Sequence, residues 1–383
     1  MTAGDHRIGI CERVRAMWGP VAIVAFVVLG SDPVAAQTVI GADGASATGP
    51  TDAESGESAQ YLESWLEESL PGATRILRVE GGDGGSSEAG LAGNGGSADG
   101  RVDATTAVSE RLYLEVESRG GDGGDRRAAD GEAGAAGTAL AGASVAHTGH
   151  DTQGLVSAKA TAVGGAGGDG VVGVGPTAGG AANAIAHGQN DAVGSIPGMR
   201  PGEGALGVSA TAFGGQGGSG ANSNADGAAG GEAIADATGQ LLQTGAGGVF
   251  ARATGGRGGV GGRLEVGGAG GDARATASGW GTGRIVVTAE QTGGSGGRGF
   301  GSAGGDGADS HMRDHVRGRA DDLVLGQTAV GGDGVPAIGP VAAALEMLRP
   351  SSSTIGRLHG GNPDGHGLRP GRKRRLGRIR RHG

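Results

Sequence analysis

A block of the form Gly-Gly-x-Gly-Gly recurs through the chain and constrains its fold more than any other feature. The Gly-Gly pairs that open these blocks begin at Gly81, Gly120, Gly164, Gly214, Gly255, Gly293 and Gly331, at spacings of 39, 44, 50, 41, 38 and 38 residues, and the last block is shortened to Gly-Gly-Asp-Gly. A period near forty residues is typical of architectures in which similar units stack and bury a shared core. The chain is therefore predicted to be a repeat protein.

Two other patterns keep phase with the blocks. Short apolar-alternating runs enter them, at residues 112–116, 156–160, 208–212, 249–253 and 285–289. The pattern Gly-Gly-x-Ala-x-Ala-x-Ala-x-Gly follows them at residues 179–188, 230–239 and 270–279. Both have the period of two that indicates β-strands, and the second has one face made only of methyl groups. Each unit is predicted to hold two short strands joined by Gly-Gly corners, since glycine tolerates positive φ.

Composition points to a shallow core. Of 383 residues, 91 are Gly and only nine are aromatic, so the side chains that bury most apolar area are scarce. We expect an all-β fold, a Gly-rich repeat β-solenoid of low complexity. Polyglycine-II-like segments at the Gly-Gly-x-Gly-Gly blocks are the alternative, and the two arrangements can coexist.

Residues 1–36 have the pattern of a secretory signal peptide. Arg7, Arg13 and Arg15 precede an apolar run from Gly19 to Leu29, and Val34-Ala35-Ala36 presents small residues before a cut at Gln37. An uncleaved anchor helix is the alternative. The only cysteine, Cys11, lies in this leader, so the mature chain would hold no disulfide. The expected location is secreted or cell surface.

Residues 37–80 form a separate N-terminal segment in this prediction. The apolar residues Tyr61, Leu62, Trp65, Leu66 and Leu70 recur at helical spacing before Pro71-Gly72. They predict an amphipathic helix over residues 57–70, which would cap the repeats of residues 81–340. A partner-binding or merely collapsed segment is the other interpretation.

Charge divides the chain into an acidic body and a basic tail. Residues 37–348 hold 18 Lys and Arg against 36 Asp and Glu, whereas residues 349–383 hold 10 against 1. An acidic body argues against nucleic acid as a partner. Residues 341–383 are predicted to be a disordered basic tail that could contact anionic lipid.

Three motifs raise the question of a site. Residues 164–172 match one calcium β-roll nonapeptide, and Asp169, Asp272 and Asp306 are weak calcium candidates near the Gly blocks. His311 and His315 have the spacing of metal ligands on a helix, but a solvated loop is the favoured interpretation. Gly293-Gly294-Ser295-Gly296-Gly297 matches a nucleophile elbow only in letters. No catalytic or cofactor-binding residue is predicted.

The alternation of Gly-Gly-x-Gly-Gly blocks with Ala-x-Ala-x-Ala runs over residues 78–335 resembles bacterial exported Gly/Ala-rich repeat proteins of the PEP-CTERM type. The run Gly-Gly-Ala-Gly-Gly-Asp-Gly at residues 164–170 is also similar to the Gly-rich region of PE-PGRS proteins, although this chain lacks their N-terminal helical domain. Pro350 and the Arg cluster of residues 372–381 fit a PEP-CTERM tail, but no apolar helix separates them. Two explanations of the missing helix are open: the tail is translated out of frame, or it is a soluble tail that never was an anchor.

The sequence thus predicts a non-enzymatic, exported protein with a structural or adhesive role at the cell surface or in extracellular matrix. Its expected partners are further copies of itself or surface and matrix components, and no small-molecule substrate is expected. The alternative is a calcium-binding, β-roll-like secreted protein.

Overall fold

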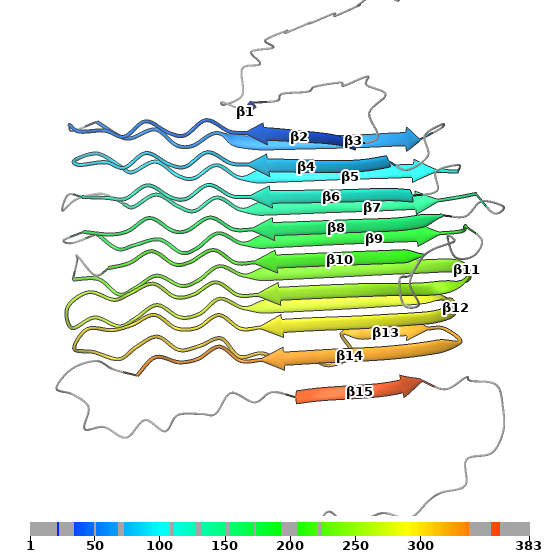
Figure 1. Ribbon diagram of the computed structural model, residues 1–383. Coiled ribbons are helices and arrows are strands. Elements are labelled where there is room, and N and C mark those ends of the chain that lie inside the picture. Colours follow the sequence, from blue (N-terminus) through cyan, green and yellow to red (C-terminus); the bar gives the residue numbers. More distant parts are fainter. Residues whose placement is uncertain are drawn as a thin grey trace, which may run out of the picture.

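The computed structural model describes residues 21–22, 34–49, 51–67, 73–107, 111–127, 132–149, 154–171, 174–192, 205–220, 224–336 and 354–360. Every regular element in these ranges is a strand (Figure 1), which confirms the all-β prediction. The strands are β1 (Val21–Ala22), β2 (Val34–Ile40), β3 (Ser58–Glu67), β4 (Ala73–Glu80), β5 (Ala98–Thr106), β6 (Arg111–Arg119), β7 (Ala139–His147), β8 (Leu155–Val163), β9 (Ala182–Asn190), β10 (Leu206–Phe213), β11 (Ala233–Thr254), β12 (Ala273–Thr292), β13 (Val316–Arg319), β14 (Asp322–Val330) and β15 (Thr354–Gly360).

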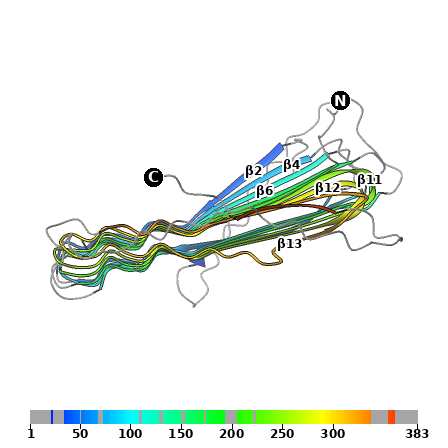
Figure 2. The ribbon, with the colours of Figure 1, turned by 90° about the horizontal axis from the view of Figure 1, so that it is seen from below.

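The strands form two facing layers (Figure 2). We call β3, β5, β7, β9, the first halves of β11 and β12, and β13 the inbound sheet. The outbound sheet comprises β2, β4, β6, β8, β10, the second halves of β11 and β12, and β14. Within each sheet these neighbours pair in parallel, and β11 and β12 run through both layers. The chain therefore circles through one strand of each sheet about once per repeat, and we call one circuit a coil.

Equivalent repeat positions stack in register along the inbound sheet. Ala233 of β11 lies opposite both Ala182 of β9 and Ala273 of β12, so the three copies of the Ala-x-Ala-x-Ala pattern form continuous ladders. Parallel pairing between successive coils keeps this register although Ala182, Ala233 and Ala273 are 51 and 40 residues apart. The three copies of the pattern therefore lie side by side in these strands.

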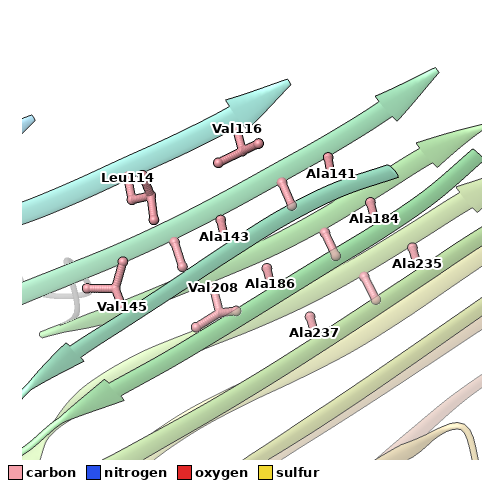
Figure 3. Packing of buried hydrophobic residues seen from close by; sticks show 14 of the residues in the cluster. Leu114, Val116, Ala141, Ala143, Val145, Ala184, Ala186, Val208, Ala235 and Ala237 are labelled. Atoms are coloured by element: carbon pink, nitrogen blue, oxygen red, sulfur yellow. The ribbon is translucent and has the colours of Figure 1, made fainter. Parts of the chain in front are cut away.

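The core lies between the two sheets and consists mainly of Ala, Val and Leu. Ala184 and Ala235 are fully buried on the inbound side, whereas Asp236 points outward and is only partly covered. Side chains such as Leu114 and Val208 face them from the outbound sheet (Figure 3). The methyl-only face is therefore the inner face, which allows two sheets to pack closely around small side chains.

The Gly-rich segments extend beyond the strands as a second part of each coil. We call them the glycine arm, which includes the described residues of 41–57, 81–97, 120–138, 164–181, 214–232, 255–272, 293–310 and 331–336. In Figure 1 the arm forms the wavy lines at the left, an outbound and an inbound segment in each coil. Each outbound segment begins where an outbound strand ends. The backbone N–H of Gly81, for example, donates to the carbonyl oxygen of Arg119 at 2.9 Å, and that of Gly120 donates to Val163 at 2.9 Å.

The arm has a three-residue period with a different hydrogen bond at each position. Gly81 donates to the following coil, Gly82 donates to the inbound segment at Glu57 over 2.9 Å, and Asp83 donates to a side chain of the preceding coil. Glycine fills the first two positions because another backbone lies against them. A Cβ atom at Gly121, for instance, would collide with the carbonyl oxygen of Gly82. The third position carries a side chain.

The prediction that the Gly-Gly pairs form tight corners is wrong. Among the described glycines, only Gly283 and Gly301 have positive φ, and neither belongs to a Gly-Gly pair that enters the arm. The blocks are extended. They need glycine for close backbone approach rather than for left-handed turns, which is the other physical reason for choosing this residue.

The predicted amphipathic helix is also wrong. Residues 58–67 form β3, which pairs in parallel with β5 so that Ala59 lies opposite Ala98. Ala59 is buried while Leu62 is 60% exposed, a strand-like alternation that the helical spacing of the larger apolar residues concealed. The ladder with β5 outweighs local helix propensity, which is a weak determinant by itself. Residues 68–70 of the predicted helix lie outside the described residues.

Two strands lie where the sequence suggested other features. β2 begins at Val34, so its first three residues precede the predicted cut before Gln37. β15 lies within residues 341–383, expected to be disordered, and pairs antiparallel with β14. The rest of that tail, and residues 1–20 and 23–33 of the leader, lie outside the described residues.

Candidate functional site

The outer face of the outbound sheet carries side chains in straight columns along the stack. One column runs through Tyr113, Ser157, Gly207, Gly248 and Val286, each from the next coil. The neighbouring column comprises Glu115, Lys159, Ser209, Phe250 and Thr288. Because parallel strands repeat these positions in every coil, any ligand of this face would meet a periodic surface.

A shallow groove opens in this face where two glycines follow one another in the column. Gly207 and Gly248 leave a depression of about 390 Å³ between Tyr113 and Val286. Phe250, Lys159 and Ser209 stand beside it in the neighbouring column. The groove therefore combines an aromatic side, hydroxyl groups and a cation over a backbone floor, and it is open along the stack.

A small polar network fixes one edge of the groove. Lys159 Nζ lies 2.7 Å from Glu115 Oε1, and the Tyr113 hydroxyl donates to Glu115 Oε2 at 2.9 Å. Burial alone would raise the pKa of Glu115, but the hydrogen bonds and the charge of Lys159 outweigh it and hold that pKa below its usual range. Burial, followed by the bond to Glu115 and its charge, raises the pKa of Tyr113 to about 12. Near neutral pH Glu115 is therefore ionised and the Tyr113 hydroxyl is neutral.

The side chains at every third position of the arm form ladders of their own. A carboxylate of one coil accepts a hydrogen bond from the backbone N–H of the same position in the next coil. Asp83 N lies 2.9 Å from Asp43 Oδ1, Asp122 N lies 2.7 Å from Asp83 Oδ1, and Ala166 N lies 2.7 Å from Asp122 Oδ1. Alanine has no acceptor, so this ladder ends at Ala166.

A second ladder runs one triplet further along. It passes from Ser86 to Asp125, Asp169 and Ser219, and Asp169 Oδ1 accepts from Ser219 N at 2.6 Å. Sequence reasoning missed both ladders, although Asp or Ser at every third residue of blocks forty residues apart was visible. These Asp side chains serve first as caps for backbone donors.

The structure places the three calcium candidates in separate segments of the arm. Asp169 is part of the second ladder, where burial first and Asp125 second raise its pKa against the lowering effect of the Ser219 hydrogen bond. Asp272 and Asp306 are exposed, in the inbound segments that precede β12 and β13. Among the described residues, no group of three or more His, Cys, Asp or Glu side chains is arranged to hold a metal ion.

The histidine pair and the nucleophile-elbow match both lie in segments that lack the geometry those motifs require. Residues 311–315 lie in an irregular segment, where His315 Nδ1 is 2.9 Å from the carbonyl oxygen of Ala275 and the His311 carbonyl accepts from Gln291. Ser295 lies in an extended outbound segment of the arm, and its carbonyl accepts a hydrogen bond from Gly258 N. The strand–turn–helix geometry of a nucleophile elbow is absent from this described segment.

The outer face of the inbound sheet offers a second shallow depression, of about 300 Å³, lined in part by Leu140, Asn183 and Ile234. Single apolar side chains stand out from this face, with Ile185 44% and Trp280 41% exposed. Ile185 lies on β9 and Trp280 on β12.

Comparison of the chain with known protein families, with curated proteins and with solved structures found no match. Within the described ranges, no helix is long and apolar enough to cross a lipid bilayer.

Proposed function

We propose that this chain is a Gly-rich repeat β-solenoid with polyglycine-II-like arm segments, exported to serve as a structural or adhesive element at the cell surface or in extracellular matrix. The observation that carries the proposal is the register of the coils, which turns single side chains into long periodic columns. Periodic faces suit extended or repeating partners, since many weak contacts add along the stack.

The groove over Gly207 and Gly248 is the part of these faces best suited to adhesion. Aromatic side chains contribute large contact area at low entropic cost, and Tyr113 and Phe250 both line the groove. Both depressions described above are open and shallow, which suits contact with a surface or polymer better than enclosure of a small molecule.

A groove-filling variant tests the adhesive role. Gly207→Val with Gly248→Val adds side chains where a Cβ atom meets nothing closer than 3.6 Å, so the coils should remain intact. Cells that display the wild-type chain should attach to matrix-coated and abiotic surfaces more strongly than cells without it, and the filled variant should lose most of this gain. A matched variant, Gly175→Val, also points into open space and should attach like the wild type. Equal attachment with and without the chain would refute the adhesive role.

Export is tested separately by the N-terminus of the released protein. Mass spectrometry should find Gln37, free or cyclised, as its first residue, because Val34-Ala35-Ala36 fits a signal-peptidase site. The cut would shorten β2 to the four residues from Gln37 to Ile40, and these keep their pairing with β4. A mature product that retains Cys11 would contradict this part of the proposal.

A further inference from the structure

The last two strands of the inbound sheet carry a strip of arginine, hydroxyl and aromatic side chains on their outer face. β12 and β13 pair in parallel, with Ser278 opposite Arg317 and Trp280 opposite Arg319. Alternate residues of both strands face outward, as the alternation of their burial shows. We call the outward residues the arginine strip: Arg274, Thr276, Ser278 and Trp280 of β12, and Arg317 and Arg319 of β13.

The three arginines of the strip are exposed cations without an acidic partner. Within the described residues, none of them makes an ion pair. On the same face of the sheet, by contrast, Arg101 Nε lies 2.9 Å from Asp99 Oδ1. The strip itself holds no carboxylate, and the neighbouring strand β11 contributes one outward acid, Asp236, opposite Thr276. A guanidinium in this state presents a planar fork of donors, the geometry that binds a carboxylate through two hydrogen bonds.

The cations of the strip are widely spaced along the strand direction. At about 3.3 Å per residue, Arg317 and Arg319 are about 7 Å apart, and Arg274 is about 13 Å from Arg317. Double-stranded DNA carries a charge about every 1.7 Å, so most of its phosphates would meet no cation here. A chain of sugar rings with at most one carboxylate on each ring has the sparser charge that this spacing matches.

Trp280 adds a flat apolar surface to the strip. Its side chain is 41% exposed and lies between Gln240 and Arg319 in the register of the strands. One face of a sugar ring consists of C–H groups, which pack against an aromatic ring as other apolar surfaces do. The strip therefore offers a partner for each kind of group on an acidic sugar: arginines for the carboxylate, Thr276 and Ser278 for hydroxyl groups, and Trp280 for the C–H face.

The charge of the rest of the chain directs a polyanion to this strip. Residues 37–132 hold 7 Lys and Arg against 19 Asp and Glu, so the coils at the other end repel it. Residues 349–383 hold 10 Lys and Arg against 1 Asp, which has the same sign as the strip and does not neutralise it.

We propose that the arginine strip binds a linear acidic polysaccharide, with its arginines on the carboxylates and Trp280 against the face of one sugar ring. The inference deepens the proposed surface role, on which it rests for location, by naming the chemistry of a matrix partner. The groove over Gly207 and Gly248 lies on the other sheet. Attachment of cells and binding of the polysaccharide are therefore separate measurements, and either proposal can fail alone.

Affinity electrophoresis of the full chain in gels that contain alginate, a linear polymer of uronic acids, tests the proposal. EDTA in the gel keeps calcium from bridging the polymer to acidic side chains. Alginate should retard the wild type, whereas neutral dextran and duplex DNA should retard it much less. Arg274→Gln with Arg317→Gln and Arg319→Gln should weaken alginate binding at least about tenfold, since the charge-assisted hydrogen bonds to carboxylates are lost. A wild type that alginate does not retard, or that DNA retards as strongly, would overturn the proposal.

A matched control removes three exposed arginines away from the strip. Arg252→Gln with Arg257→Gln and Arg263→Gln changes the net charge equally and should bind alginate like the wild type. Both triple variants should keep the circular dichroism spectrum and melting temperature, because all six side chains are exposed. A chain that ends at Gly360 lacks the basic cluster of the tail and should lose less affinity than the strip variant. Equal losses in the two triple variants, or a loss that only removal of the tail produces, would show that the strip is not the binding site.

Trp280 provides a direct readout of contact. In a chain with Trp18→Phe and Trp65→Phe it is the only tryptophan, and its emission should shift to shorter wavelength as alginate is added. Trp280→Ala should weaken binding, and this loss should persist at high salt, which screens the arginine contacts. An emission spectrum that saturating alginate leaves unchanged would place the polymer elsewhere and contradict the proposal.

Discussion

A Cβ atom at Gly239 would lie 2.5 Å from Cγ2 of Val249 across the core. Gly239 closes the Ala-x-Ala-x-Ala pattern in the inbound half of β11, and Val249 lies in the outbound half of the same strand. In the preceding coil, a Cβ atom at Gly188 would likewise lie 2.6 Å from Cγ2 of Val208. The glycine that ends each pattern is thus matched in volume to a valine of the opposite sheet, and this pairing explains why the pattern ends in glycine.

Substitution of Gly239 should reveal this match. Gly239→Ala overpacks the core and should cost about 1–3 kcal/mol of unfolding free energy, measured by thermal or denaturant unfolding. Adding Val249→Ala should restore part of the loss by making room for the new methyl group. Gly248→Ala, on the outer face with nothing within 4 Å, is the control and should not destabilise the fold. An equal cost for Gly239→Ala and Gly248→Ala would contradict the match.

Neighbouring positions on β11 should respond unequally to the same enlargement. Ala235 is fully buried between the sheets, whereas Asp236 lies on the outer face. Ala235→Leu should therefore lower the melting temperature, with an overpacking cost of about 1–3 kcal/mol, and Asp236→Leu should have little effect. Equal shifts for the two variants would show that the inward assignment of Ala235 is mistaken.

Asp169 should destabilise the fold when it is ionised. Its pKa is raised in the folded chain by burial and by Asp125, so the carboxylate form is disfavoured there relative to the unfolded chain. The stability linked to this group is complete below its unfolded pKa of about 3.9 and is lost as the pH rises through the folded pKa. Asp169→Asn keeps an oxygen for Ser219 N but cannot ionise. It should melt at a higher temperature than the wild type at pH 7 and at the same temperature near pH 3.

The control for this prediction is Asp169→Ala. It removes the acceptor that lies 2.6 Å from Ser219 N, so it should lower the melting temperature at both pH values. If Asp169→Asn melted lower than the wild type at pH 7, burial would not be the dominant influence on this carboxylate.

Glu115 should act in the opposite sense. Its pKa is lowered in the folded chain, so it stabilises the fold above its unfolded pKa of about 4.3, and this contribution is lost as the pH falls through the folded pKa. Glu115→Gln should melt below the wild type at pH 7, and the gap should narrow below pH ~4. Glu117→Gln removes a more exposed ion pair with Arg78 and should have the smaller effect at pH 7. If the difference in melting temperature between Glu115→Gln and the wild type were the same at all pH values, Lys159 and Tyr113 would not stabilise the ionised form of Glu115.

The period of forty residues, the strands at Ala-x-Ala-x-Ala and the inward direction of the alanines followed from the sequence by itself. Each depends on a pattern that can be read in the sequence: a period of two decides which face of a strand is small, and a recurrence near forty residues indicates that similar units stack. The sequence also offered polyglycine-like segments as an alternative to strands. The structure has both extended arms and paired strands, joined end to end in each coil.

Tertiary structure decided the rest, because the deciding contacts lie a whole coil away. Tyr61 and Trp65 are four residues apart, as on one face of a helix, yet β3 is a strand because β5 supplies a parallel partner. Glycine in the arm could have served positive φ or close approach, and only the neighbouring backbone shows that it is the second. Asp169, a calcium candidate in the sequence, accepts a hydrogen bond from the backbone N–H of Ser219 in the next coil. A hydrogen bond between residues fifty apart leaves no local signature in the sequence.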